Sequence, residues 1–306
     1  MRKKIDLSIN LGGLKLKNPT ILASGILGLD CGSLKKVAQG GAGAVTMKSL
    51  TLESRKGHNN PILIQAGRDV FMNAVGYANK GIDNGIEEFK KWEGGVPLIG
   101  SIVASEVDEF VKLTEKIITL SIAAIEIPLS CPHTPGFGLM AGQGTPEATA
   151  KIVRAVRKKT KLPLIVKLSP SVSAIGEIGK AAEAAGADVL NMGNTLGPGM
   201  KIDIERGTPI LAFKVGGMSG PAIKPIMIRC VFDLFCAVKI PIIATGGITT
   251  GEDVVEAFMA GASAVGIGTG IYYRGINIFS KVVTEIKKWM KMHNYKKIND
   301  IKGIAH

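Results

Sequence analysis

Features that would point to a membrane are scarce in this sequence. No stretch reaches the roughly 18 consecutive uncharged apolar residues that a membrane-spanning helix requires. The basic residues at 1–5 are followed by a polar, strand-like segment instead of the apolar core of a signal peptide. These absences predict a cytoplasmic protein without a membrane partner.

Cysteine is also scarce, with Cys31, Cys131, Cys230 and Cys236 the only four among 306 residues. No two of them have the Cys-x-x-Cys spacing of a zinc site or an iron–sulfur cluster, so the chain itself is expected to bind no metal. A disulfide framework is not expected in so long a chain with so few cysteines. The thiols are therefore candidates for chemistry, to be judged from their surroundings.

Acidic residues are outnumbered, because 38 Lys and Arg against 25 Asp and Glu give a formal net charge of +13. The small basic clusters at 154–161 and 287–297 fall on helical segments that also carry an apolar stripe. Such clusters are typical of solvated helix faces, so no nucleic-acid partner is predicted. The excess positive charge is suited to attracting anionic small molecules.

The sequence does contain a regular alternation of apolar strands and amphipathic helices. Strands are predicted at 20–23, 44–47, 98–102, 124–127, 164–167, 189–192, 242–245 and 264–267. Helices are predicted between them, for example at 106–118, 145–158, 174–185, 223–237 and 251–260. Near-continuous apolar strands indicate a parallel sheet covered by helices, and eight such units at this length favour an α/β fold of the closed (β/α)8, or TIM-barrel, type.

The segment 5–16 alternates apolar and polar residues around Gly12 and Gly13, which predicts an N-terminal β-hairpin. No flexible linker interrupts the chain, so residues 1–306 are predicted to form a single domain. In such barrels the active site is built at the C-terminal ends of the strands. The candidate functional residues are therefore those that follow the predicted strands.

Small residues follow the last two predicted strands. Gly246 and Gly247 come after the seventh strand, and Gly268 and Thr269 after the eighth. Barrels often bind phosphate in these two loops, because backbone N–H groups can approach it there. The alternative is that these residues only form tight turns. That interpretation explains one such loop better than it explains two at the expected places.

Two lysines, Lys48 and Lys167, end apolar strands, where a buried ammonium needs a polar or anionic partner. Lys167 is suited to stabilising negative charge on a reduced flavin ring, although a Schiff-base nucleophile and a lysine reaching the barrel rim remain alternatives. Cys131 follows the fourth strand and precedes a glycine-rich loop that is suited to closing over a substrate. It is a candidate general base, and the alternative is a small buried thiol.

Polar side chains complete the set of candidates. Asn73, Asn79, Asn194 and Thr195 offer donors and acceptors that match the edge of a pyrimidine-like ring, although each alone is also typical of a turn.

Taken together, these residues resemble the FMN subunit of class 1 dihydroorotate dehydrogenases over essentially the whole chain, and the NAD-linked class 1B form more closely than the fumarate-linked one. The matching strings are ASG at 23–25, KS at 48–49, NAVGYAN at 73–79, SCP at 130–132, KLSP at 167–170, NT at 194–195, GGMSGPAIKP at 216–225, GG at 246–247 and GT at 268–269. The string at 216–225 is the most specific of them.

The resemblance implies an oxidoreductase that converts dihydroorotate to orotate in pyrimidine biosynthesis, with hydride passing to flavin N5. It assigns the catalytic base to Cys131. It assigns FMN binding to Ser24, Lys48, Ser49, Ser101, Lys167, Gly193, Gly220, Gly246, Gly247, Gly268 and Thr269. It assigns the substrate to Lys48, Asn73, Ala74, Val75, Gly76, Tyr77, Asn194 and Thr195. It also implies a homodimeric core and a partner subunit carrying FAD and an iron–sulfur cluster.

Two positions depart from the family pattern. Pro128 and His133 stand where the family usually has asparagines that hydrogen-bond the substrate, and proline offers no side-chain donor or acceptor. A related flavin barrel that acts on another dihydropyrimidine is therefore the alternative within the class. A flavin-free phosphate-binding isomerase or aldolase, and a barrel that only binds a partner, are the alternatives outside it.

Overall fold

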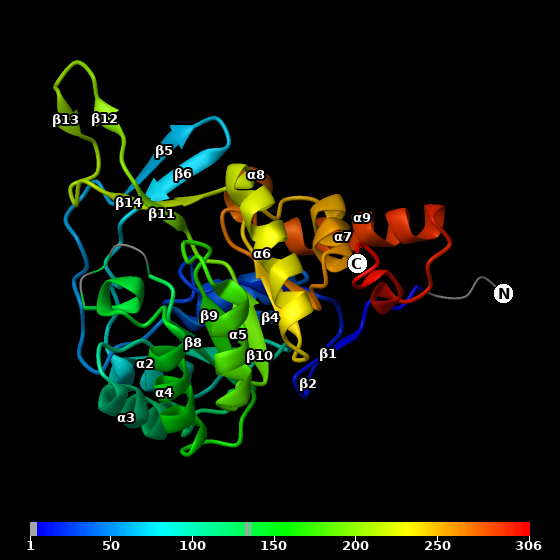
Figure 1. Cartoon of the computed structure of the whole chain (residues 1–306), viewed down its shortest axis with the longest axis horizontal. Coiled ribbons are helices and arrows are strands. Elements are labelled where there is room, and N and C mark those ends of the chain that lie inside the picture. The colour runs from blue at the N-terminus through cyan, green and yellow to red at the C-terminus, as the bar shows by residue number, and fades with distance from the viewer. Residues whose placement is uncertain (1–4, 132–133, 135) are drawn as a thin grey trace.

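The computed structural model describes residues 5–131, 134 and 136–306. In these residues a barrel of parallel strands is surrounded by helices, and a smaller sheet projects from one of its ends (Figure 1). None of the helices within this described part is long and apolar enough to cross a membrane.

Eight strands form the barrel, each within a residue or two of its predicted position. They are β3 (Thr20–Leu22), β4 (Ala44–Thr46), β7 (Leu98–Ser101), β8 (Ala124–Pro128), β9 (Leu164–Leu168), β10 (Val189–Met192), β15 (Ile242–Thr245) and β16 (Ala264–Ile267). Every neighbouring pair is parallel, and β16 pairs with β3 to close the barrel. All their residues are buried because side chains fill the interior and helices cover the outside. The predicted TIM barrel is confirmed.

The helices of the described residues cover the outside of the barrel. They are α1 (Cys31–Gln39), α2 (Ile82–Phe89), α3 (Val107–Ile117), α4 (Pro146–Arg157), α5 (Ile175–Ala184), α6 (Lys224–Ala237), α7 (Gly251–Met259), α8 (Gly270–Arg274) and α9 (Ile278–Met292). Local sequence fixes where they begin. Helix α4, for example, starts at Pro146 after Thr145, whose hydroxyl accepts a hydrogen bond from the Ala148 amide.

The predicted N-terminal hairpin is present as β1 (Ile9–Leu11) and β2 (Leu14–Leu16), which pair antiparallel. Its turn uses Gly12 and Gly13 at φ values of 58° and 95°, which favour glycine. A side chain at Gly12 would come within 2.7 Å of Val189, the first residue of β10. The hairpin therefore packs against the N-terminal end of the barrel, opposite the end where the active site is expected.

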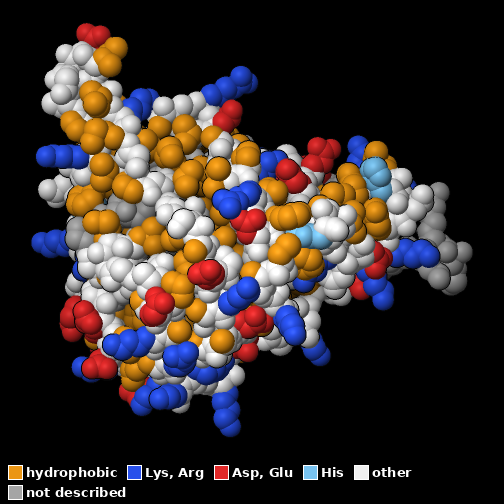
Figure 2. All heavy atoms as spheres, viewed as in Figure 1, with side chains coloured by type: hydrophobic (Ala, Val, Ile, Leu, Met, Phe, Trp, Pro, Cys, Tyr) orange, Lys and Arg blue, Asp and Glu red, His pale blue; other side chains and the backbone are white. Residues whose placement is uncertain are grey.

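The projecting sheet was not predicted from the sequence. Its order is β11 (Leu196–Gly199), β14 (Gly216–Ser219), β6 (Val70–Asn73) and β5 (Leu63–Gly67), and the short pair β12 (Ile202–Asp203) and β13 (Thr208–Pro209) extends it. Because these strands follow β4 and β10 in the chain, they rise above the C-terminal end of the barrel (Figure 1). Apolar side chains are exposed on this sheet and on the β12–β13 pair (Figure 2). Among them are Leu63, Ile202 and Ile204.

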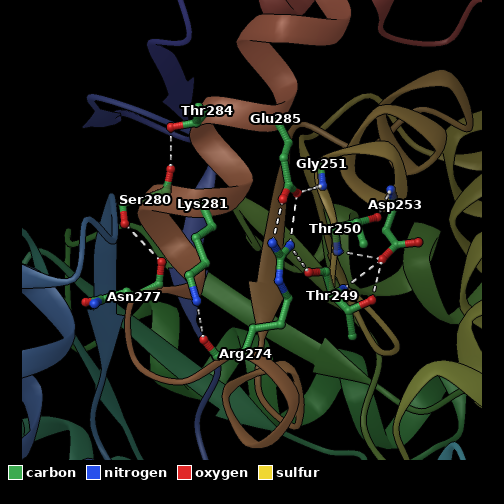
Figure 3. Close-up of polar contacts among 10 residues, drawn as sticks. All are labelled: Thr249, Thr250, Gly251, Asp253, Arg274, Asn277, Ser280, Lys281, Thr284 and Glu285. Atoms are coloured by element: carbon green, nitrogen blue, oxygen red, sulfur yellow. Dashed lines mark hydrogen bonds and ion pairs between the residues drawn. The ribbon is translucent and has the colours of Figure 1, made fainter.

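The segment after β15 is held from behind by two carboxylates (Figure 3). Glu285 on α9 accepts a hydrogen bond from the Gly251 amide (2.7 Å) and pairs with Arg274 through both oxygens. Asp253 accepts from the amides of Thr249 and Thr250, each at 2.8 Å. These contacts satisfy the first N–H groups of α7 and fix the loop that leads out of the barrel.

Both carboxyl groups are held in their charged form. Hydrogen bonds from Arg274 lower the pKa of Glu285, and this effect outweighs that of partial burial. Burial alone would raise the pKa of Asp253, but the Lys224 ammonium and the loop amides outweigh it and lower that pKa. A carboxyl pKa that is lower in the folded state contributes stability at pH values above the unfolded value and loses it as the pH falls through the folded value.

We expect Glu285→Gln to lower the free energy of unfolding by about 1 kcal/mol at pH 7, because it removes one charge of a partly exposed pair. Thermal melts of both proteins from pH 7 to pH 2.5 would measure the difference. It should shrink below the usual glutamate pKa of 4.5 and vanish once the native carboxyl is protonated. The exposed Glu205 serves as control, since Glu205→Gln should be neutral throughout. A difference that does not change with pH would contradict this account.

Candidate active site

A cavity of about 360 Å³ opens at the C-terminal end of the barrel, beneath the projecting sheet. Residues from distant parts of the chain line it. Those predicted from the sequence are Ser24, Lys48, Ser49, Asn73, Val75, Gly76, Tyr77, Cys131, Lys167, Asn194, Thr195, Gly220, Gly246, Gly247, Gly268 and Thr269. The barrel and the projecting sheet thus bring most of the predicted site residues to one place.

Three predicted residues are not among the lining residues. Ser101 is fully buried, and its hydroxyl lies 2.9 Å from that of Ser49, which does line the cavity. Ala74 belongs to the small core of the projecting sheet. A side chain on Gly193 would come within 1.6 Å of the Thr245 carbonyl, so glycine is needed there for close packing. The ligand contacts predicted for these three residues remain predictions.

One end of the cavity is walled by backbone. Gly246 and Gly247 have φ values of 142° and 74°, and Gly247 packs directly on Lys224 of α6. Gly268 and Thr269 follow the neighbouring strand β16 and line the same cavity, and the Thr269 hydroxyl hydrogen-bonds that of Ser219 (2.9 Å). A wall without side chains lets a phosphate approach backbone N–H groups closely.

The floor of the cavity carries a buried ammonium. Lys167 on β9 is 3% exposed, donates to the Ser24 hydroxyl at 3.1 Å and lies 3.9 Å from a carboxylate oxygen of Glu126. Lys48, after β4, faces the same cavity. Burial lowers the pKa of Lys48, and the nearby Lys167 cation lowers it further. Two cations, of which only Lys167 is paired with a carboxylate, favour an anionic ligand.

No role was predicted for Glu126 from the sequence. This residue on β8 is 2% exposed and accepts hydrogen bonds from Ser24 (2.5 Å) and Asn191 (2.6 Å). The only signal in the sequence was a single acidic residue within an otherwise apolar strand. A charge buried in that way must be paired, but its partners lie on other strands, so the sequence does not identify them.

Cys131 lies above this floor, at the end of β8. The thiol is 6% exposed, lines the cavity and hydrogen-bonds the Thr134 hydroxyl at 3.2 Å. Burial raises the pKa of Tyr77 well above its usual range, and the charge of Cys131 and a hydrogen bond with that residue raise it further. The phenol therefore stays protonated beside the sulfur at physiological pH.

The remaining polar residues differ in their surroundings. Asn194 lines the cavity and donates to the Ser130 hydroxyl at 2.8 Å. Asn79 is buried away from the cavity, where its side chain bonds Thr51 and the Tyr77 carbonyl. Pro128 is part of the cavity wall. The predicted contributions of Pro132 and His133 lie outside the described residues.

Fold and site together define a class. An eight-stranded barrel with a backbone-walled phosphate end, a buried lysine on the fifth strand and a thiol after the fourth strand is the arrangement of a barrel oxidoreductase with a phosphate-bearing redox cofactor.

Comparison with known proteins identifies the family. Residues 6–290 match the dihydroorotate dehydrogenase family model. The chain is 44% identical over 305 residues to the catalytic subunit of dihydroorotate dehydrogenase B (NAD(+)) of Methanocaldococcus jannaschii, covering 98% of each chain. It is 43% identical over 299 residues to that of Pyrococcus abyssi, covering 98% of this chain and 99% of the relative. The chain therefore belongs to the dihydroorotate dehydrogenase family, whose members are FMN-dependent oxidoreductases.

A solved structure supports the fold independently. The crystal structure of the Eimeria tenella dihydroorotate dehydrogenase in complex with ferulenol aligns with a TM-score of 0.86, covering 100% of this chain and 90% of that one. At 22% sequence identity this match shows the shared barrel alone.

The residues present fit FMN. The glycine wall suits its phosphate and the Lys167 ammonium suits the electron-rich edge of its ring. Ser24, Ser49 and Thr269, which carry hydroxyl groups, line the same cavity.

We expect Gly247→Ala to weaken FMN binding at least tenfold, or about 1.4 kcal/mol. The new methyl group would meet Lys224 at 2.6 Å and would strain a left-handed backbone, so the phosphate wall must shift. Fluorescence titration of the apoprotein with FMN would measure the affinity. Gly207→Ala is the matched control, because Gly207 has a similar φ of 64° but no neighbour near its side-chain position. Equal FMN affinities for all three proteins would contradict the placement of the phosphate at this wall.

Proposed function

We propose that this chain catalyses the FMN-dependent oxidation of (S)-dihydroorotate to orotate, a step of de novo UMP biosynthesis. Membership of the dihydroorotate dehydrogenase family is the observation that carries the proposal. The cavity supports it, since a buried thiol, two lysines and two asparagines face one space. FMN dependence of the family argues against the flavin-free isomerase or aldolase.

In the proposed reaction the Cys131 thiolate removes a proton from the ring carbon next to the carbonyl. The C–H bond pair of that carbon becomes the new C=C bond, while the neighbouring carbon loses a hydride. FMN, when bound, supplies the acceptor for this hydride. Charge builds up on the carbonyl oxygen as the proton leaves, and the Lys48 ammonium is placed in the same cavity to stabilise it.

Side chains around Cys131 hold the reacting groups in position. The Thr134 hydroxyl fixes the thiol, and the protonated Tyr77 phenol lies beside the sulfur. Asn73 and Asn194 face the cavity from the projecting sheet and from the end of β10. Their amides are suited to the alternating donors and acceptors of the substrate ring.

Pro128 favours a second candidate within the same class. It occupies the cavity wall and offers no side-chain hydrogen bond. A dihydropyrimidine that lacks the carboxylate or has a different amide pattern would need fewer such bonds. Anaerobic spectra of the FMN-loaded protein, recorded after addition of dihydroorotate or of dihydrouracil, separate the two candidates. Bleaching by dihydroorotate supports the first, and bleaching by dihydrouracil alone supports the second.

We expect Cys131→Ala to retain FMN but to slow flavin reduction by dihydroorotate about 100-fold or more, because a positioned base is lost. Anaerobic stopped-flow spectroscopy at the flavin absorbance band measures the rate. Cys230→Ala is the matched control, since Cys230 is a buried thiol on α6 outside the cavity lining. Full activity of Cys131→Ala would refute the assignment of the base.

We also propose that the chain works in an assembly with other subunits. Related chains are named catalytic subunits, which supports a partner that takes electrons onward, and we propose one with FAD and an iron–sulfur cluster. The exposed apolar side chains of the projecting sheet support a homodimeric core. We also propose that residues 1–306 act as a single domain, and that the protein works in the cytoplasm, where its free cysteines stay reduced.

A further inference from the structure

Glu126 is a deeply buried carboxylate at the cavity floor, and the proposed reaction does not use it. It is 2% exposed and lies behind Lys167, outside the cavity lining as described. Its neighbours come from separate barrel strands, so the closed barrel brings them together. A buried charge of this kind is costly unless it is paired. The presence of Glu126 at this place therefore calls for a functional explanation.

Both oxygens of Glu126 accept hydrogen bonds. Ser24 donates to one oxygen at 2.5 Å, and Asn191 donates its amide to the other at 2.6 Å. The Thr245 hydroxyl donates to the Asn191 oxygen at 2.7 Å, which turns the amide nitrogen toward the carboxylate. The carboxylate is therefore hydrogen-bonded from two sides and forms an ion pair with Lys167.

This carboxylate is placed to control Lys167. The ammonium donates to Ser24, which in turn donates to Glu126, and the direct distance between ammonium and carboxylate is 3.9 Å. Both side chains are nearly inaccessible to solvent, at 4% and 3%, so their charges are only weakly screened. Lys167 faces the cavity and Glu126 stands behind it, so a ligand meets the lysine charge partly offset by the carboxylate.

We propose that Glu126 is a positioning residue that sets the reduction potential of bound FMN by orienting Lys167 and offsetting part of its charge. The proposal rests on the proposed placement of the flavin ring beside Lys167. Reduction adds more electrons than protons to the ring, so negative charge builds up there. Lys167 favours this change, and the charge of Glu126 opposes it, which keeps the potential low enough for electrons to pass onward.

The test is Glu126→Gln in the FMN-loaded protein. Glutamine has nearly the same shape, and it can accept from Asn191 and donate to Ser24, whose hydroxyl must then turn to another acceptor. Spectroelectrochemical titration against a reference dye, without dihydroorotate, gives the potential directly. We expect the equilibrium constant for reduction to rise at least tenfold, which corresponds to about 30 mV for a two-electron couple.

A second variant separates charge from loosened packing. Thr245→Val removes the hydroxyl that orients Asn191 but changes no charge, and it should shift the equilibrium constant far less than Glu126→Gln. Equal shifts in the two variants, no shift, or a lower potential in Glu126→Gln would each overturn the proposal. So would loss of FMN from Glu126→Gln alone, since Glu126 would then serve binding. Failure of the unaltered protein to bind FMN would instead refute the proposed function.

Discussion

The cavity floor depends on burying an ammonium and a carboxylate together inside the barrel. Lys167 and Glu126 lie on adjacent parallel strands, in a register that pairs Pro128 with Lys167. Neither charge would be tolerated there alone, because desolvation in the interior costs several kcal/mol per ion. Ser24, two residues after β3, and Asn191 on β10 complete the hydrogen bonding. Closure of the barrel is therefore a condition for the site as well as for the core.

The phosphate end depends on a different arrangement of charge. Asp253 and Glu285 bind the loop amides and the start of α7 from outside (Figure 3). Lys224 pairs with Asp253, and Arg274 pairs with Glu285. The protein thus satisfies the rear of the loop with its own anions. The glycine wall on the cavity side stays open to a ligand anion. The loop is therefore hydrogen-bonded from behind, while its cavity side is accessible to the phosphate that we propose binds there.

Sequence patterns could predict the barrel because its strands carry their signal locally. A segment such as Ile242–Thr245 is apolar throughout, as buried parallel strands are, and helix starts such as Thr145 are marked by capping residues. The projecting sheet lacks such a signal. β14 is Gly-Gly-Met-Ser and pairs with β6, from a distant part of the chain, so neither strand predicts the other. Its presence also explains how Asn73 and Gly220 reach one cavity.

The residues of the site likewise differ in how far the local sequence predicts them. Cys131, Lys48 and Lys167 were found because the ends of barrel strands converge by rule. Glu126 was missed because its meaning depends on which side chains face it across the barrel, and that requires the register of four strands. Asn79 resembled a ligand residue by type but holds the Thr51 and Tyr77 segments instead. A polar residue at the end of a barrel strand can be predicted to lie at the site. Its role depends on the side chains that it contacts there.

The two lysines of the cavity differ in their electrostatic surroundings. Lys167 has a carboxylate behind it, so its charge is moderated, whereas Lys48 is opposed by Lys167 and lacks a comparable acidic neighbour among the described residues. Burial and the second cation lower the pKa of Lys48, and an anion placed beside it would reverse that effect. An incoming carboxylate or a developing oxyanion therefore gains more from Lys48 than from Lys167. In the proposed placement, substrate charge is drawn to the Lys48 side, close to Cys131, and the flavin ring lies beside the moderated cation of Lys167.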